Sequence, residues 1–184
     1  MKKGILVFAV VFIFCLSVSA CIGADADAFR FQDTWTWGME QKEVMADFRP
    51  GTYELDRERK LDYLEIDDDH YKWENFRAEL KFGFKDGELV VILLSFDTED
   101  RGVSADKILA ALETLYGSSE VITDHKIADE LMAMVDRDEI EMEIRRNDTV
   151  RQWTLDDGTV ILMKAEAHDD DLDVVFFEEG FVRN

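Results

Sequence analysis

Strict alternation of apolar and polar residues over positions 76–85 is the feature that most restricts the fold of this chain. The apolar positions are Phe76, Ala78, Leu80, Phe82 and Phe84. A period of two is typical of a β-strand with one buried face. Asp86-Gly87, a preferred two-residue hairpin turn, follows, and residues 89–96 form a second apolar run. The sequence therefore predicts a β-hairpin here.

A two-residue turn fixes the expected register of this hairpin. It places Phe84 beside Leu89, Phe82 beside Val91 and Leu80 beside Leu93. The return strand is apolar at nearly every position. We therefore expect it to lie in the centre of a sheet, or to have its second face covered.

Periodicity elsewhere predicts further elements. Helical spacing favours helices over residues 39–48, 105–116 (with Ser104 as N-cap and Gly117 as stop) and 123–135. Alternation favours strands over residues 61–66, 140–145, 150–155, 159–164 and 172–177. A two-residue turn at Asp157-Gly158 would put one set of side chains on a single face, namely Ile140, Met142, Trp153, Leu155, Val160 and Leu162.

These elements predict an α+β fold in which antiparallel β-meanders pack against short helices. We expect a signal peptide at 1–20, a tether at 21–33 and a single domain at 34–184. An alternative organisation of that domain has two degenerate halves, 34–100 and 101–184. Each half would be a helical lead-in followed by a meander.

The N-terminal segment has the layout of a secretory signal. Lys2 and Lys3 precede an uninterrupted apolar run at residues 5–16, and small residues follow. The run is short for a membrane-spanning helix, which needs about 20 apolar residues. A retained anchor remains an alternative to cleavage.

Residues 18–21, Val-Ser-Ala-Cys, resemble the bacterial lipobox, whose cysteine is acylated after cleavage. The only other cysteine, Cys15, lies inside the apolar run, so residues 22–184 contain no disulfide, thiol nucleophile or thiolate ligand. This favours lipidation of Cys21 over ordinary cleavage after Ala20 or near Ala26-Asp27-Ala28.

The charge of the chain excludes some partners. Loss of Lys2 and Lys3 with the signal changes the formal net charge from −21 to −23. Such a surface repels nucleic acid and anionic lipid headgroups. We expect contact with a membrane through an acyl chain alone, and a protein as the partner.

Catalytic patterns are weak. No Gly-x-Ser-x-Gly elbow, glycine-rich phosphate loop or dinucleotide fingerprint occurs. Carboxylate pairs are uninformative in a chain with 42 acidic residues. Two acidic runs that contain histidine suggest a site for calcium or another divalent cation, with candidate ligands Asp67, Asp69, His70, His168 and Asp170. The alternative is that both runs are solvated turns.

Four aromatic residues are candidates for a partner-binding patch, namely Trp35, Trp37, Tyr71 and Trp73. Tryptophan is common at binding hot spots. The alternative, which we favour, is that they close the edge of the core.

Three short motifs suggest a family. Trp37-Gly38-Met39 before a helix with Glu43-Val44, then Leu115-Tyr116-Gly117 and Asp157-Gly158-Thr159, resemble uncharacterised exported bacterial proteins. The helix-then-meander order is similar to small outer-membrane assembly lipoproteins of the SmpA/OmlA type and to β-lactamase-inhibitor protein. That resemblance implies binding to other proteins and assigns no site residue. Glu40 departs from it, since a capping Ser is expected there.

We therefore expect an exported, lipid-anchored binding or assembly module rather than an enzyme. A metal-dependent or carboxylate-based envelope hydrolase is the alternative. Dimerisation through the second face of the strand at 89–96 is a further hypothesis.

Overall fold

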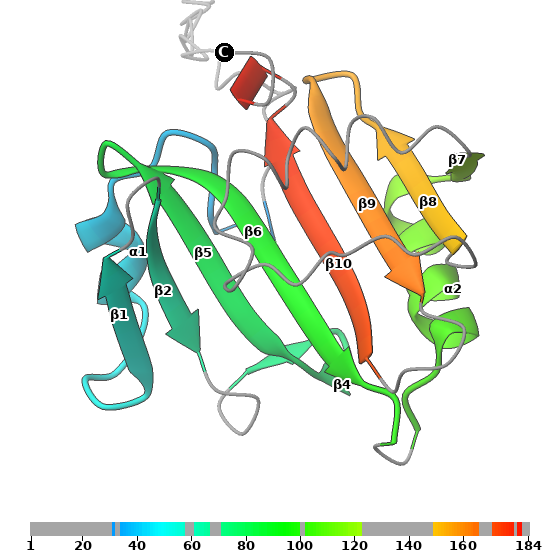
Figure 1. Cartoon of the computed structure of the whole chain (residues 1–184), viewed down its shortest axis with the longest axis horizontal. Coiled ribbons are helices and arrows are strands. Elements are labelled where there is room, and N and C mark those ends of the chain that lie inside the picture. Colours follow the sequence, from blue (N-terminus) through cyan, green and yellow to red (C-terminus); the bar gives the residue numbers. More distant parts are fainter. Residues whose placement is uncertain are drawn as a thin grey trace, which may run out of the picture.

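The computed structural model describes residue 31 and residues 34–57, 61–66, 71–99, 102–122, 149–165, 171–178 and 180–181. Within them the main element is a twisted antiparallel sheet of eight strands, in the order β1-β2-β5-β6-β10-β9-β8-β7 (Figure 1). The strands are β1 (Tyr53–Arg57), β2 (Asp62–Ile66), β5 (Glu79–Lys85), β6 (Glu88–Asp97), β7 (Glu120–Ile122), β8 (Thr149–Thr154), β9 (Thr159–Ala165) and β10 (Asp171–Glu178).

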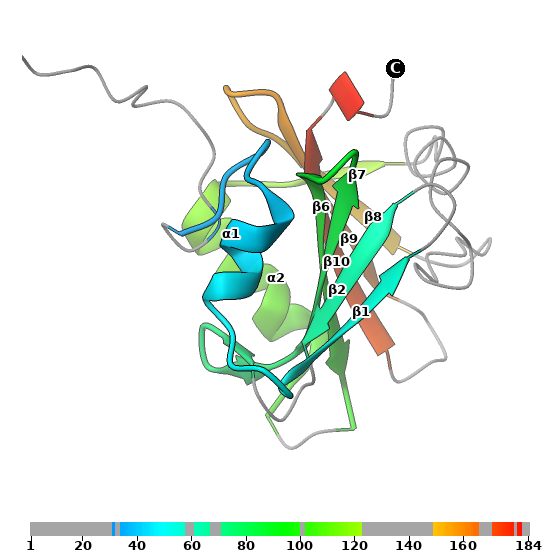
Figure 2. The ribbon, with the colours of Figure 1, turned by 90° about the vertical axis from the view of Figure 1, so that its left-hand side faces the viewer.

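Two short helices and a small hairpin complete the described fold. Helices α1 (Gln41–Ala46) and α2 (Ala105–Tyr116) lie on the same side of the sheet (Figure 2). Strands β3 (Lys72–Trp73) and β4 (Phe76–Arg77) form a separate two-stranded sheet between β2 and β5 in the sequence. The fold is thus dominated by antiparallel sheet, with helices as a minor component.

The sheet buries apolar side chains on both faces. The first core lies on the helix side and joins Val44 of α1 and Ile108 and Leu112 of α2 to sheet residues such as Phe82 and Phe176. The second core lies on the other face. Its buried residues are Leu61, Tyr63, Val91, Leu93, Val150, Val160, Leu162, Val175, Phe177 and Phe181.

The central position predicted for the strand at 89–96 is confirmed. Strand β6 pairs with β5 on one side and with β10 on the other. Its side chains alternate between the two cores, with Ile92 in the first and Val91 in the second. Burial on both sides explains why the strand is apolar throughout.

The predicted register of the hairpin is correct only next to the turn. Phe84 pairs with Leu89 as expected, but a bulge between Gly83 and Phe84 shifts the remainder by one residue. Phe82 therefore pairs with Ile92 instead of Val91, and Leu80 with Leu94 instead of Leu93. A bulge places two residues opposite one, which a turn motif cannot reveal.

The prediction that Trp153, Val160 and Leu162 share one face of the strands around Asp157-Gly158 was wrong. The connection closes between Leu155 and Thr159, so Trp153 pairs with Ile161. Trp153 belongs to the first core, whereas Val160 and Leu162 belong to the second. A slip of one residue exchanges the two faces of a strand.

Most other predicted elements agree with the structure where it describes them. Both helices, β2, β8, β9 and β10 match their expected positions within two residues. The continuous strand expected from residue 76 is interrupted at Ala78, and β1, β3 and β7 were not predicted. The expected helix at 123–135 and strand at 140–145 lie outside the described residues.

Candidate functional site

The β3–β4 hairpin is held in place by an aromatic anchor. Trp73 is 1% exposed and its ring packs edge-on against Phe96 of β6, with the centroids 5.9 Å apart. Phe76, its cross-strand partner, contacts both rings. Because alternate side chains of a strand point to opposite faces, this anchor directs Lys72 and Arg77 away from the core.

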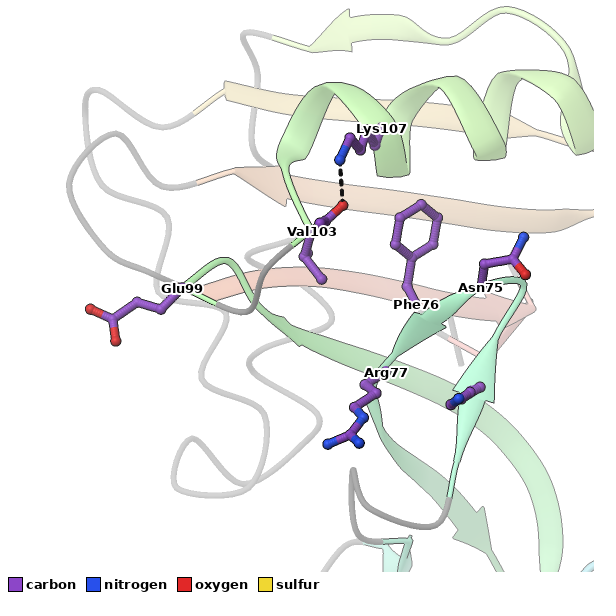
Figure 3. A pocket seen from close by; sticks show the side chains of 8 residues that line it. Asn75, Phe76, Arg77, Glu99, Val103 and Lys107 are labelled. Carbon is purple, nitrogen blue, oxygen red and sulfur yellow. Dashed lines mark hydrogen bonds between the residues drawn. The ribbon is translucent and has the colours of Figure 1, made fainter.

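A pocket of about 770 Å³ lies where this hairpin, the end of β6 and the start of α2 meet (Figure 3). We call it the cationic pocket. Its lining residues are Lys72, Asn75, Phe76, Arg77, Glu99, Gly102, Val103 and Lys107. Among these described residues are three cations, Lys72, Arg77 and Lys107, and one carboxylate, Glu99, in a chain whose formal net charge is −21.

Two features of the hairpin oppose its stability. Lys72 and Arg77 are a directly opposed cross-strand pair, and like charges in that position are destabilising. Glu74, in the turn, has a φ of 54°, in the left-handed region that is unfavourable for residues with a Cβ. Locally destabilising features of this kind tend to occur at functional sites.

One cation of the pocket is fixed by the loop before α2. The ammonium of Lys107 donates a 2.7 Å hydrogen bond to the carbonyl of Gly102 (Figure 3). This bond holds the first turn of α2 against residues 102–103. Because a lysine has three donors, Lys107 retains donors for a ligand.

Two tyrosines near this hairpin contribute to the first core: Tyr71 is buried in it, and Tyr116 is half-buried and packs against it. Burial raises the pKa of Tyr71 far above its usual value, and the phenol of Tyr116 and the carboxylate of Glu74 add to the shift. Burial, assisted by Glu74, raises the pKa of Tyr116 to about 12. Both phenols are therefore neutral at physiological pH, and neither is a candidate base.

The four candidate aromatic residues do not form an exposed patch. Trp35, Tyr71 and Trp73 are buried in the first core at 6, 8 and 1% exposure. Trp35 stacks on Phe48, and its indole donates a 2.8 Å hydrogen bond to Asp47. Trp37 is half-buried and packs against the same core. Their role in the structure is to close the core.

The other candidate site residues lie outside the described part of the chain. They are Cys21, the proposed lipidation site, and the proposed metal ligands Asp67, Asp69, His70, His168 and Asp170. Among the residues that are described, no group of three or more His, Cys, Asp and Glu side chains is arranged to hold a metal ion. Likewise, no helix of the described part is long and apolar enough to cross a membrane.

Sequence reasoning did not find the cationic pocket. Lys72 and Arg77 flank the Trp73–Phe76 segment. In such an acidic chain, two cations on either side of an aromatic pair are a pattern that could have indicated a binding site. Lys107 is 30 residues further on and joins them only through the packing of α2.

Comparison of the chain with models of protein families, with curated proteins and with solved structures gave no match. The fold and the pocket together define an antiparallel sheet protein with helices on one face and a cationic pocket at one end.

Proposed function

We propose that the protein is an extracytoplasmic, lipid-anchored binding or assembly module that docks onto another envelope protein through the cationic pocket. The observation that supports this most strongly is the opposed pair Lys72 and Arg77 beside Lys107. An acidic chain would gain stability from an acid at either strand position. A negatively charged group on a partner would be attracted to this cluster of three cations.

The order of the elements favours a role for this hairpin. We propose that the two halves are a degenerate duplication, with α1-β1-β2-β5-β6 corresponding to α2-β7-β8-β9-β10. Their strands occur in mirrored order across the sheet, and β6 and β10 meet at the centre. On this interpretation β3–β4 is an addition to the first half, and added loops and hairpins on a shared scaffold are where binding functions reside.

The anchor is proposed on sequence grounds. Acylation of Cys21 would hold an acidic domain at a membrane whose headgroups repel it. Metabolic labelling with a palmitate analogue tests this. The wild-type chain is expected to incorporate label and to fractionate with membranes, whereas Cys21→Ser is expected to do neither. Unlabelled wild-type protein in the soluble fraction would contradict the anchor.

Photo-crosslinking in intact envelopes tests the docking. A photoreactive side chain at the exposed position Asn75 is expected to capture a distinct protein partner, and Lys72→Gln/Arg77→Gln is expected to abolish the capture. Lys42→Gln/Arg49→Gln removes the same charge at exposed positions on and after α1 and is expected to leave the capture unchanged. Equal capture by both double variants would contradict docking at this pocket.

A further inference from the structure

We infer that the face of the sheet that carries the second core is a docking surface for the chain's own segment 123–148. We call this face the second face. None of the residues of the second core lines the cationic pocket, so this surface is separate from the one proposed for a partner.

The second face is shielded from solvent across most of the sheet. Its ten buried apolar residues are 0–5% exposed, and they include Tyr63 of β2 and Val150 of β8. From β2 to β8 there are five spacings between neighbouring strands, or about 24 Å. Lys164, which alternates with Leu162 along β9, is only 1% exposed. Because side chains stand roughly perpendicular to a sheet, burial over this width requires a second layer.

The described elements do not supply this layer. Helices α1 and α2 lie over the first core, on the opposite side of the sheet (Figure 2). Phe181, after β10, adds one ring, and the ammonium of Lys85 lies 5.4 Å from the centre of that ring. In the part of the chain that the structure describes, no helix packs on the second face. These exposures are those of a single chain, so the layer comes from other residues of the same chain.

The sequence identifies the segment that can form such a layer. Apart from residues 123–148, the internal segments outside the described residues have at most five residues each, and Ala167 is their only apolar residue. Residues 21–30 precede Phe31, which is buried in the first core on the other side. Segment 123–148 has 26 residues, and its large apolar residues are Ile127, Leu131, Met132, Met134, Val135, Ile140, Met142 and Ile144.

Both ends of this segment lie at the second face. Ile122 and Val150 are directly paired across β7 and β8, and both contribute to the second core. Two strands paired in this way are usually joined by about two to five residues. A much longer connection that begins and ends beside the second core is positioned to fold back over it.

The pattern and length of the segment fit the second face. Ile127, Leu131 and Met134 recur at helical spacing and form one apolar stripe, whereas Lys126 and Asp129 fall on the opposite side. A helix over residues 123–135 is about 20 Å long, which reaches from β8 to β5 at about 4.8 Å per strand. Such a helix buries its stripe against the second core and presents its charged side to solvent.

Disulfide trapping tests this docking on the mature chain. Cys21→Ser leaves residues 21–184 without a cysteine, so an introduced pair is the only one present. Each of the changes Ile127→Cys, Leu131→Cys and Met134→Cys is combined in turn with a second-core change, namely Leu93→Cys, Leu162→Cys or Val175→Cys. The matched controls use the adjacent residue of the same strand, which faces the first core, namely Leu94→Cys, Ile161→Cys or Val174→Cys.

Mild oxidation is expected to close an intramolecular disulfide in at least one second-core pair and in none of the controls. A disulfide needs Cα atoms within about 7 Å of each other, so the two faces of a strand are distinguished. Non-reducing electrophoresis and peptide mapping measure the outcome. Disulfides with the first-core positions, or with neither set, would overturn the inference. Disulfides between two chains would also overturn it, because they would assign the second face to another copy.

A second measurement does not depend on disulfide geometry. Leu131→Asn places an amide on the apolar stripe, whereas Met132→Asn makes a similar change beside the stripe. The first variant is expected to have the lower midpoint of denaturant unfolding, because burial of an amide without hydrogen-bond partners is costly. Equal midpoints for the two variants would overturn the docking of this stripe.

Discussion

The indole nitrogen of Trp37 donates a 2.8 Å hydrogen bond to the hydroxyl of Thr159, which lies 122 residues further along the chain. Thr159 is fully buried at the start of β9. The bond ties the segment before α1 to the half of the sheet formed by β7–β10. It is thus a long-range constraint on how the two proposed halves are joined.

Removal of this bond is expected to destabilise the fold. Thr159→Val keeps the shape of the side chain but leaves the indole N–H without this acceptor, at a cost of about 1–3 kcal/mol of unfolding free energy. Trp37→Phe also loses packing. In a double-mutant cycle measured by denaturant unfolding we expect a coupling of about 1 kcal/mol. Purely additive effects would show that the bond contributes nothing.

Gly83→Ala is expected to destabilise the second core. The added Cβ would lie 3.2 Å from the Cβ of Val91 and 3.3 Å from Leu61. Overpacking of this kind costs about 1–3 kcal/mol, measurable as a lower denaturant midpoint. Leu61→Ala removes the Cδ1 atom that the new Cβ would approach, so it should cost less unfolding free energy in the Gly83→Ala chain than in the wild type. Gly180→Ala, where a Cβ meets nothing within 4 Å, is the control and is expected to have little effect.

Glu74→Gly is expected to stabilise the protein. A residue with a Cβ in the left-handed region costs about 1–2 kcal/mol, and glycine removes that cost at a smaller entropic penalty. We expect a net gain of up to about 1 kcal/mol in thermal or chemical unfolding. Glu74→Ala removes the carboxylate but keeps the Cβ, so a gain from Ala equal to that from Gly would assign the effect to charge instead.

Stability is expected to fall in alkaline solution because of Tyr71 and Tyr116. Their pKa values are raised in the folded state, so the unfolded chain releases these protons first. Their contribution to the stability of the fold is complete below pH 10, the ordinary pKa of tyrosine. It is lost progressively as the pH rises toward 12 and beyond. In this range, each tyrosine makes the unfolding free energy fall by up to about 1.4 kcal/mol per pH unit.

Denaturant unfolding at a series of pH values measures this loss. Tyr116→Phe should remove one of the two contributions and lower the slope, without changing the pH at which the loss begins. A variant that retained the full slope would show that Tyr116 is not responsible. Spectrophotometric titration of the folded wild type should show phenols that ionise later than in the denatured chain, and Tyr116→Phe should remove one of them.

The local pattern of the sequence was sufficient for most single elements. Helix α2 follows from its stripe of Ile108 and Leu112 and its stop at Gly117, and the β5–β6 turn follows from Asp86-Gly87. Strands β3 and β7 have only two and three residues, too few to show a period, so pairing with neighbours defines them. Strand β1 alternates only over Tyr53–Asp56, and its pairing with β2 establishes it as a strand. Such pairing energy is absent from a local pattern.

The pairing register of the strands could be determined only from the tertiary structure, for the same reason. Alternation indicates which residues of a strand share a face, and it is unchanged by a bulge at Gly83 or by a longer turn before Thr159. Each of these shifts the pairing by one residue, and in the second case the shift moved Trp153 to the opposite core from Val160.

The sequence by itself determined the alternating core strands, the two helices and the strong acidity of the chain. It also provides all the evidence for export and for acylation of Cys21, which remain predictions. Only the tertiary structure decided that the tryptophans are mostly internal and that Lys107 joins Lys72 and Arg77 in one pocket. Burial and the convergence of distant side chains depend on how elements pack, and no spacing along the chain encodes that packing.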